Sequence, residues 1–195
     1  MARYTVPYVS LMPATGALVP VAIWRADDAV GGDPAREPVV ERLLQLYEYD
    51  ASDTYGADLE ADGRYHVMDL ARLWHPDYEV HLIAVDGHLA GFAFVARHAS
   101  YVDGAPTWLM DEFFVLRKYR RRGGGGHVAR ALFDGHPGRW ELGQLEGSAA
   151  ARAFWRATLG RYTGGAYREV RLATARWRGP VQSFVAPGPA TTSTT

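Results

Sequence analysis

The sequence of 195 residues contains no cysteine. Disulfide bonds, thiolate zinc sites and cysteine nucleophiles are therefore excluded for this chain. Lysine is nearly absent as well, because the 21 Lys and Arg residues include a single lysine, Lys118. That ratio is typical of codon usage in a GC-rich genome, and no function follows from it. The net charge of −1 argues against a nucleic-acid partner, although one short basic cluster is present.

Long apolar runs are also missing. Pro7, Pro13 and Pro20 interrupt the N-terminal stretch, which has neither the basic start nor the unbroken apolar core of a signal peptide or membrane span. The hydrophobic share of 48% and the charged share of 22% are ordinary for a soluble globular protein. We therefore expect a cytoplasmic protein without a membrane partner.

Composition divides the chain into three parts. Residues 1–18 contain proline and glycine and predict an N-terminal extension. Residues 186–195 have no large apolar side chain and predict a disordered tail. Residues 19–185 carry the helix and strand patterns, and we expect one folded domain there.

Three β-rich segments follow one another in the middle of the chain, at 80–85, 89–96 and 107–116. Asp86 and Gly87 separate the first two, and an Asp-Gly pair favours the tight turn of a two-residue hairpin. The pattern predicts a meander of three antiparallel strands.

Helical spacing and proline or glycine boundaries indicate the other elements. They are a strand at 19–25, a helix from Asp33 or Glu37, a loop at 50–64, helices at 65–73, after 126 and at 149–159, and strands at 139–145, 162–164 and 169–177. Together they predict an α/β (α+β) fold with a mixed, mostly antiparallel central sheet flanked by about four helices.

A glycine-arginine loop, Arg120 to Gly126, joins the third predicted strand to a helix. Backbone N–H groups at a helix start bind phosphate, and glycines let a ligand approach the main chain. The arginines supply positive charge to a pyrophosphate. The alternative is a solvated arginine face with a loose turn, but a turn needs one glycine and this loop has four. No Gly-Lys-Ser/Thr follows, and the preceding strand belongs to a meander, so neither common nucleotide-binding loop fits.

The segment 113–125 resembles motif A of the GNAT (N-acetyltransferase) superfamily, whose core Arg/Gln-x-x-Gly-x-Gly/Ala matches Arg120, Gly123 and Gly125. The resemblance implies a splayed sheet that binds acetyl-CoA and direct transfer of the acetyl group to an amine. It also implies that the pantetheine of the donor contacts the backbone of the strand before motif A. The expected donor-binding residues are Phe114, Val115, Leu116, Arg120, Arg121, Arg122, Gly123, Gly124, Gly125 and Gly126.

The later segment 148–156 resembles motif B, and the whole resemblance covers roughly 37–177. Two departures stand out. Ser148 occupies the place of the family's usual asparagine, and Trp155 that of the tyrosine that commonly protonates the leaving CoA thiolate. An indole N–H donates a hydrogen bond but is not a usable acid. Donor binding is therefore better supported than catalysis.

The resemblance further implies an acidic general base on the strand before the loop or on the neighbouring strand, acting directly or through water. Asp111 and Glu112 are the only carboxylates in 108–116, and adjacent strand residues point to opposite faces. We choose Glu112 as the catalytic residue; the alternative is that either carboxylate lies at a sheet edge or pairs with an arginine. His127 could contact phosphate, although a surface position is the simpler interpretation. No His-x-x-x-His spacing is present, so we expect no metal.

In the resembling family the acceptor pocket is usually built by the first two helices and their loop. Tyr47, Asp50 and Tyr65 fall in that part of this chain and would suit a small-molecule amine. The alternative is that the tyrosines are packing residues and the acids are solvated. Two other functions stay open: the same fold with a carrier-protein or aminoacyl-tRNA donor, and a non-catalytic CoA-binding module. Dimers are common in the family, so a homodimer is compatible with the sequence.

Overall fold

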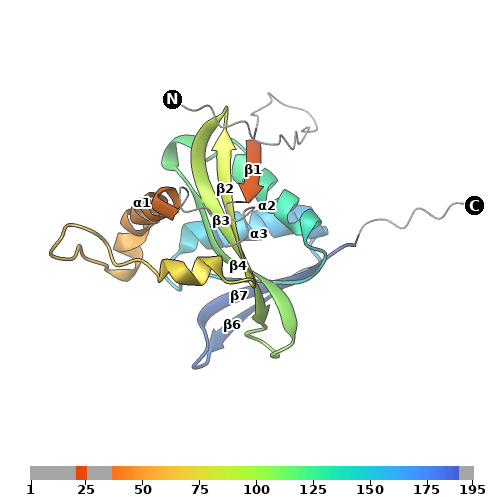
Figure 1. Cartoon of the computed structure of the whole chain (residues 1–195). Coiled ribbons are helices and arrows are strands. Elements are labelled where there is room, and N and C mark those ends of the chain that lie inside the picture. Colours follow the sequence, from red (N-terminus) through yellow and green to blue (C-terminus); the bar gives the residue numbers. More distant parts are fainter. Residues whose placement is uncertain (1–20, 26–36, 189–195) are drawn as a thin grey trace, which may run out of the picture. The chain divides into compact units, whose positions relative to one another are not determined.

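The structure is a computed structural model that describes residues 21–25 and 37–188. Its elements, with η for short 3-10 helices, are β1 (Val21–Arg25), α1 (Glu37–Tyr55), η1 (Leu70–Trp74), β2 (Tyr78–Val85), β3 (His88–Ala99), β4 (Pro106–Val115), η2 (Arg117–Tyr119), α2 (Gly124–Gly135), β5 (Gly138–Gly143), α3 (Ala149–Thr163), β6 (Arg168–Ala173) and β7 (Arg178–Ala186). The strands form one sheet in the order β1-β2-β3-β4-β5-β7-β6 (Figure 1).

The sheet is mixed, as predicted. Strands β4 and β5 are parallel, whereas β1–β2, β5–β7 and β6–β7 are antiparallel pairs. The meander is confirmed, since β2, β3 and β4 are neighbours in the sheet. The described part of the chain has three α-helices, where the sequence predicts about four. Within the same ranges, no helix is both long and apolar enough to cross a membrane.

Contacts between Cα atoms group the chain into two compact units. Of the described residues, the first comprises 21–25, 37–95 and 112–128, and the second comprises 96–111 and 129–188. Strands β3 and β4 contribute residues to both units. Helix α1 and the glycine-arginine loop belong to the first unit, so the residues expected to bind the donor and the acceptor lie within it.

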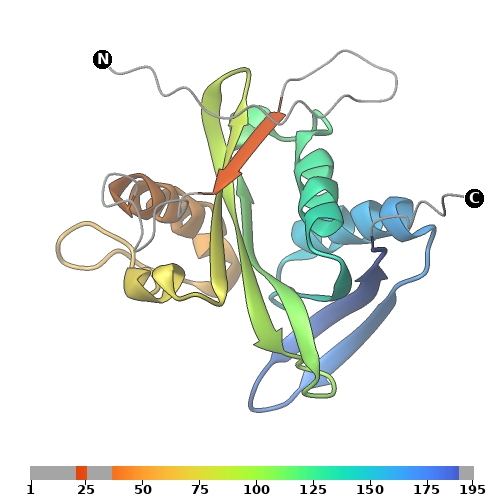
Figure 2. The same cartoon turned by 45° about the vertical axis from the view of Figure 1, so that its right-hand side comes forward.

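The first unit is built on the β2–β3 hairpin and on α1, which lies beside it (Figures 1 and 2). Asp86 and Gly87 form the hairpin turn with φ angles of 52° and 74°, as the Asp-Gly pair predicts. The Tyr47 ring of α1 meets the rings of Phe92 and Phe114 at centroid distances of 5.9 and 5.6 Å. The side chains that α1 buries are Val40, Leu43 and Leu44. This apolar side of α1 fixes the helix against the strands.

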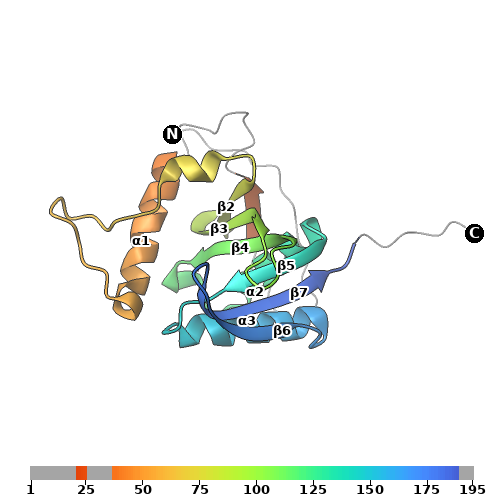
Figure 3. The ribbon, with the colours of Figure 1, turned by 90° about the horizontal axis from the view of Figure 1, so that it is seen from below.

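An aromatic cluster forms the core of the second unit. The Phe133 ring of α2 lies 4.9 Å from Trp140 of β5 and 4.8 Å from Phe184 of β7, measured between ring centroids. Helix α3 lies beside β6 (Figure 3). Arg156 of α3 donates two hydrogen bonds to the Glu169 carboxylate of β6 at 2.9 and 2.5 Å. Packing between rings and a bidentate ion pair therefore attach the helices of this unit to its strands.

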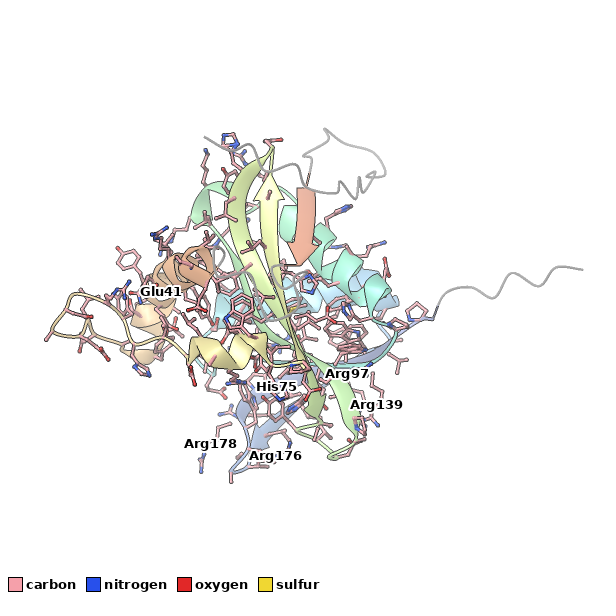
Figure 4. All side chains as sticks on the ribbon, viewed as in Figure 1. Glu41, His75, Arg97, Arg139, Arg176 and Arg178 are labelled. Atoms are coloured by element: carbon pink, nitrogen blue, oxygen red, sulfur yellow. The ribbon has the colours of Figure 1, made fainter. Side chains whose placement is uncertain are left out.

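The β3–β4 turn, also in the second unit, is held by polar contacts. Glu141 of β5 is only 2% exposed and accepts hydrogen bonds from Ser100 Oγ at 2.5 Å and the Tyr101 N–H at 2.8 Å. Arg176, labelled in Figure 4, donates to the carbonyl oxygens of Ala99 at 2.6 Å and Ser100 at 3.2 Å. These bonds satisfy a buried carboxylate and tie the β6–β7 turn to the β3–β4 turn.

Some expected boundaries in the first unit are wrong. Helix α1 extends to Tyr55 and so occupies the start of the loop expected at 50–64. The helix expected at 65–73 is only the short η1. The side chain of Asp69 caps η1, and Pro76 disfavours its continuation because the residue before a proline avoids helical backbone angles.

The end of α3 also differs from the prediction. The helix continues through Gly160 to Thr163 and ends where Gly164 adopts a left-handed φ of 63°. The strand expected at 162–164 is therefore wrong. Gly160 stays helical because its neighbour Leu159 is fully buried, so tertiary packing outweighs the poor helix propensity of glycine.

The sequence does not predict strand β7, because Gly179 and Pro180 near its start interrupt a strand pattern. In the structure β7 pairs with both β5 and β6, and its last residue, Ala186, is 1% exposed. Ala186 therefore belongs to the sheet and not to the tail expected at 186–195. Three expectations concern residues outside the described ranges: the extension at 1–18, a helix start at Asp33 and the tail beyond residue 188.

Candidate active site

The glycine-arginine loop lies between the end of β4 and the start of α2. After η2 the chain turns through two left-handed residues, Arg121 with a φ of 64° and Gly123 with a φ of 80°. A Cβ at Gly123 would meet no atom within 4 Å, so this glycine serves the backbone angle and not a close contact. The turn directs the chain into α2 at Gly124.

The first turn of α2 presents backbone N–H groups that lack helical partners. The His127 N–H donates to the Gly123 carbonyl at 3.2 Å. The N–H groups of Gly124, Gly125 and Gly126 precede that bond and donate to no group in the described ranges of the chain. Together with the positive end of the helix dipole, these N–H groups suit the oxygen atoms of a phosphate.

The arginines of this region form two pairs with different surroundings. Arg117 and Arg120 both form ion pairs with Asp50 of α1. Arg121 and Arg122 are exposed, and neither forms an ion pair with a residue that the structure describes. The sequence predicts phosphate contacts for Arg120, Arg121 and Arg122. The ion pair of Arg120 with Asp50 leaves Arg121 and Arg122 as the favoured phosphate contacts.

Three contacts hold the Arg120 side chain. Its Nε donates to the Val115 carbonyl at 2.6 Å, its Nη2 donates to Asp50, and its guanidinium carbon lies 5.5 Å from the centroid of the Phe114 ring. Burial raises the pKa of Asp50, but hydrogen bonds from Arg120 and Arg117 outweigh that effect and hold the pKa below its ordinary value. Asp50 is therefore an ionised, paired carboxylate, and its contact with an acceptor stays a prediction.

The end of β4 is held close to β3. A Cβ added to Gly91 of β3 would lie 2.0 Å from the Phe114 carbonyl oxygen. The Leu116 N–H donates to the Ala90 carbonyl at 2.8 Å, which continues the pairing past β4. The Phe114 side chain is 4% exposed and belongs to the core, so only its backbone could meet a ligand. An isolated glycine in an apolar strand signals such a close approach, and this signal could have identified Gly91.

The titratable residues near the loop are partly shielded from solvent. Glu112, the expected general base, is half-buried on β4, two residues before Phe114. His127 is also half-buried, on the first turn of α2 beside the glycine N–H groups. Glu112 is therefore only partly accessible, and its role as the general base stays a prediction.

The three expected acceptor residues lie on α1 or are tied to it. Tyr47 packs its ring against the aromatic side chains of β3 and β4, and Asp50 binds the two arginines. The Tyr65 N–H donates to Gln45 Oε1 at 2.8 Å, and the Tyr65 carbonyl accepts from Gln45 Nε2 at 2.9 Å. Gln45 therefore fastens the segment after α1 to that helix, a role that no sequence pattern signals.

The motif B residues have structural positions in the second unit. Ser148 is the N-cap of α3, although its side chain makes no capping hydrogen bond. Trp155 is 6% exposed, and its ring lies 4.8 Å from Phe154 and 6.4 Å from Phe133 between centroids. Trp155 is therefore a packing residue, and the structure gives it no acid function.

Comparisons with known proteins agree with this geometry. The family described as acetyltransferase (GNAT) matches residues 43–160, which is more than half of the chain. Among curated proteins, none matches the sequence.

Solved structures share the fold at low identity. A GNAT-family acetyltransferase from Staphylococcus aureus Mu50 has a TM-score of 0.56 and 12% identity, with 85% of this chain and 99% of that chain covered. An acetyltransferase from Thermus thermophilus has a TM-score of 0.57 and 14% identity, with 84% and 96% covered. An aminoglycoside 6′-N-acetyltransferase complexed with coenzyme A has a TM-score of 0.51 and 16% identity, with 86% and 99% covered. The chain belongs to the acetyltransferase (GNAT) family and is an acyltransferase of that type.

Proposed function

We propose that the protein transfers the acetyl group of acetyl-CoA to a primary amine of a small molecule. The observation that carries this proposal is the start of α2. Gly124, Gly125 and Gly126 offer three N–H groups that bond nothing in the described ranges, and the exposed Arg121 and Arg122 precede them. Oriented donors combined with positive charge suit the diphosphate of CoA.

The reaction needs an uncharged amine, because an ammonium group has no lone pair with which to attack a thioester carbonyl. We assign Glu112 as the general base that takes a proton from the incoming amine, directly or through water. The amine nitrogen bonds the carbonyl carbon, the carbon–sulfur bond breaks, and the sulfur leaves as a thiolate that takes up a proton. Trp155 cannot supply that proton, so we assign water, which gives a proton to the sulfur and accepts the proton that the nitrogen releases as the amide forms. Glu112 returns its own proton to the solvent.

The acceptor is proposed to bind beside α1, near Tyr47, Asp50 and Tyr65. A small-molecule acceptor is supported by the similar fold of an enzyme named aminoglycoside 6′-N-acetyltransferase. The tyrosine rings and the carboxylates of this region would contact the apolar and the cationic parts of an amine. A cytoplasmic location fits the absence of cysteine, and a homodimer is compatible with the family.

The proposal is tested with purified protein, acetyl-CoA and a panel of small amines, with products detected by mass. An amine that gains one acetyl group, and gains none with heat-denatured protein, supports the proposal. Binding of acetyl-CoA without acetylation of any amine favours a non-catalytic CoA-binding module, which the tryptophan at position 155 in place of the family's tyrosine also favours. Failure to bind acetyl-CoA favours a carrier-protein or aminoacyl-tRNA donor.

A further inference from the structure

Asp50 joins the first helix to the loop proposed for the donor. Its carboxylate pairs with Arg117 and Arg120, which are 67 and 70 residues away in the sequence. We infer that Asp50 is a positioning residue for acyl-CoA binding, acting through Arg120 on the backbone that leads into the glycine-arginine loop. The inference rests on the proposed function, because it requires that this loop binds the diphosphate of the donor.

Arg120 closes the segment between the end of β4 and the loop. Its Nε donates to the Val115 carbonyl at 2.6 Å, while its Nη2 is held by Asp50. Within the same segment the Tyr119 N–H donates to the Leu116 carbonyl at 2.9 Å. Because both ends of the segment are fixed, the chain enters the left-handed turn of the loop from a defined position. A binding site held in this way loses less conformational entropy when the ligand arrives.

The pair with Arg120 matters more than the pair with Arg117. The side chains of Asp50 and Arg120 are 19% and 37% exposed, whereas that of Arg117 is 72% exposed. Water and salt screen the more exposed pair, so it orders the chain less. Arg120 also contacts a backbone carbonyl, and no hydrogen bond from Arg117 to a carbonyl of the described chain accompanies its ion pair.

Removing the charge of Asp50 has two opposing effects on a phosphate ligand. The net charge near the loop becomes more positive, which favours the ligand. The guanidinium group of Arg120, partly buried, loses its counter-charge and the anchor that keeps it on the Val115 carbonyl, which disfavours an ordered loop. We expect the loss of order to dominate, because the exposed Arg121 and Arg122 already provide positive charge.

The test compares two acetyl donors in the Asp50→Asn variant, which keeps the size of the side chain. The expected dissociation constant for acetyl-CoA rises roughly ten-fold. The KM for acetyl-CoA, measured at saturating amine, rises with it. The thioester S-acetyl-N-acetylcysteamine lacks the diphosphate, so its kcat/KM reports only on the amine and the general fold, and it falls less than the kcat/KM for acetyl-CoA. A general structural defect, or a lost contact with the amine alone, would reduce the use of both donors equally.

Matched variants complete the design. Asp53→Asn, an exposed carboxylate on the same helix, keeps wild-type affinity, and Asp50→Glu restores part of the loss. Arg120→Gln weakens acetyl-CoA binding as well, and the double variant is no weaker than the worse single variant, since both changes break one contact. The inference is overturned, while the proposed function stands, if Asp50→Asn binds acetyl-CoA with wild-type affinity. It is also overturned if kcat/KM falls equally for acetyl-CoA and for the short thioester. A wild-type protein that does not bind acetyl-CoA overturns the proposed function with it.

Discussion

Gly91 of β3 and Phe114 of β4 approach so closely that a Cβ on the glycine would lie 2.0 Å from the carbonyl oxygen of Phe114. The same Cβ would lie 2.9 Å from the Phe114 carbonyl carbon and 3.0 Å from the Cα of Val115. All three obstacles are backbone atoms, so no side-chain rotation can relieve the clash. The close approach lies where β4 ends, a few residues before the glycine-arginine loop.

Gly91→Ala is therefore expected to lower the free energy of unfolding by about 2–3 kcal/mol, because one strand must shift to admit the methyl group. Urea denaturation followed by circular dichroism measures this change. The shift of β4 also displaces the backbone of Val115, so we expect acetyl-CoA to bind the folded variant more weakly than it binds the wild type.

Gly160→Ala is the matched control for the stability measurement. Gly160 lies inside α3, and an added Cβ would meet no atom within 4 Å. Alanine is the better helix former, so this variant should unfold at higher urea, with a gain of about 0.5–1 kcal/mol. A Gly91→Ala protein as stable as the wild type would show that the strands do not approach as described.

A second prediction concerns the pH dependence of stability. Hydrogen bonds from Arg156 lower the pKa of Glu169 to about 2, against the effect of burial, and Gln182 adds a further bond. A carboxyl group with a lower pKa in the folded state stabilises the fold above its unfolded pKa, and this contribution is lost as the pH falls toward about 2. In urea denaturation, Glu169→Gln should therefore be less stable than the wild type at about pH 7 and much closer to it at about pH 3.

The control for this experiment is Asp53→Asn, a change of an exposed carboxylate that forms no ion pair with the described residues. The difference in stability between this variant and the wild type should stay small at both pH values. A difference between Glu169→Gln and the wild type that is independent of pH would contradict the ionised pair with Arg156.

A third prediction separates the arginines of the loop. Arg121→Gln and Arg122→Gln should each raise the dissociation constant for acetyl-CoA about five-fold, which corresponds to about 1 kcal/mol, and the loss should shrink as salt is added. Arg117→Gln should have a smaller effect, since that arginine pairs with Asp50. Calorimetric titrations at two salt concentrations measure these dissociation constants. An equal loss of affinity at positions 117, 121 and 122 would contradict the proposal that Arg121 and Arg122 contact the donor while Arg117 does not.

The sequence predicts the local features of this fold better than its long-range contacts. The hairpin at Asp86 and Gly87 follows from a turn dipeptide, and the loop before α2 follows from its glycines. The contact between Asp50 and Arg120 spans 70 residues, and nothing local to either residue signals it. The same reason explains the missed strand β7, because its two partners in the sheet outweigh the local effect of Pro180.

The claim that the start of α2 binds the donor is tested most directly by calorimetric titration of the wild type and of Gly125→Val with acetyl-CoA. Valine is no worse than glycine for helix formation, so the variant should fold, but its side chain obstructs the approach of a diphosphate to the N–H groups. Gly135→Ala, at the other end of α2, is the control. We expect micromolar binding by the wild type and the control and none by folded Gly125→Val. Equal binding by all three proteins, or no binding by the wild type, would contradict the claim.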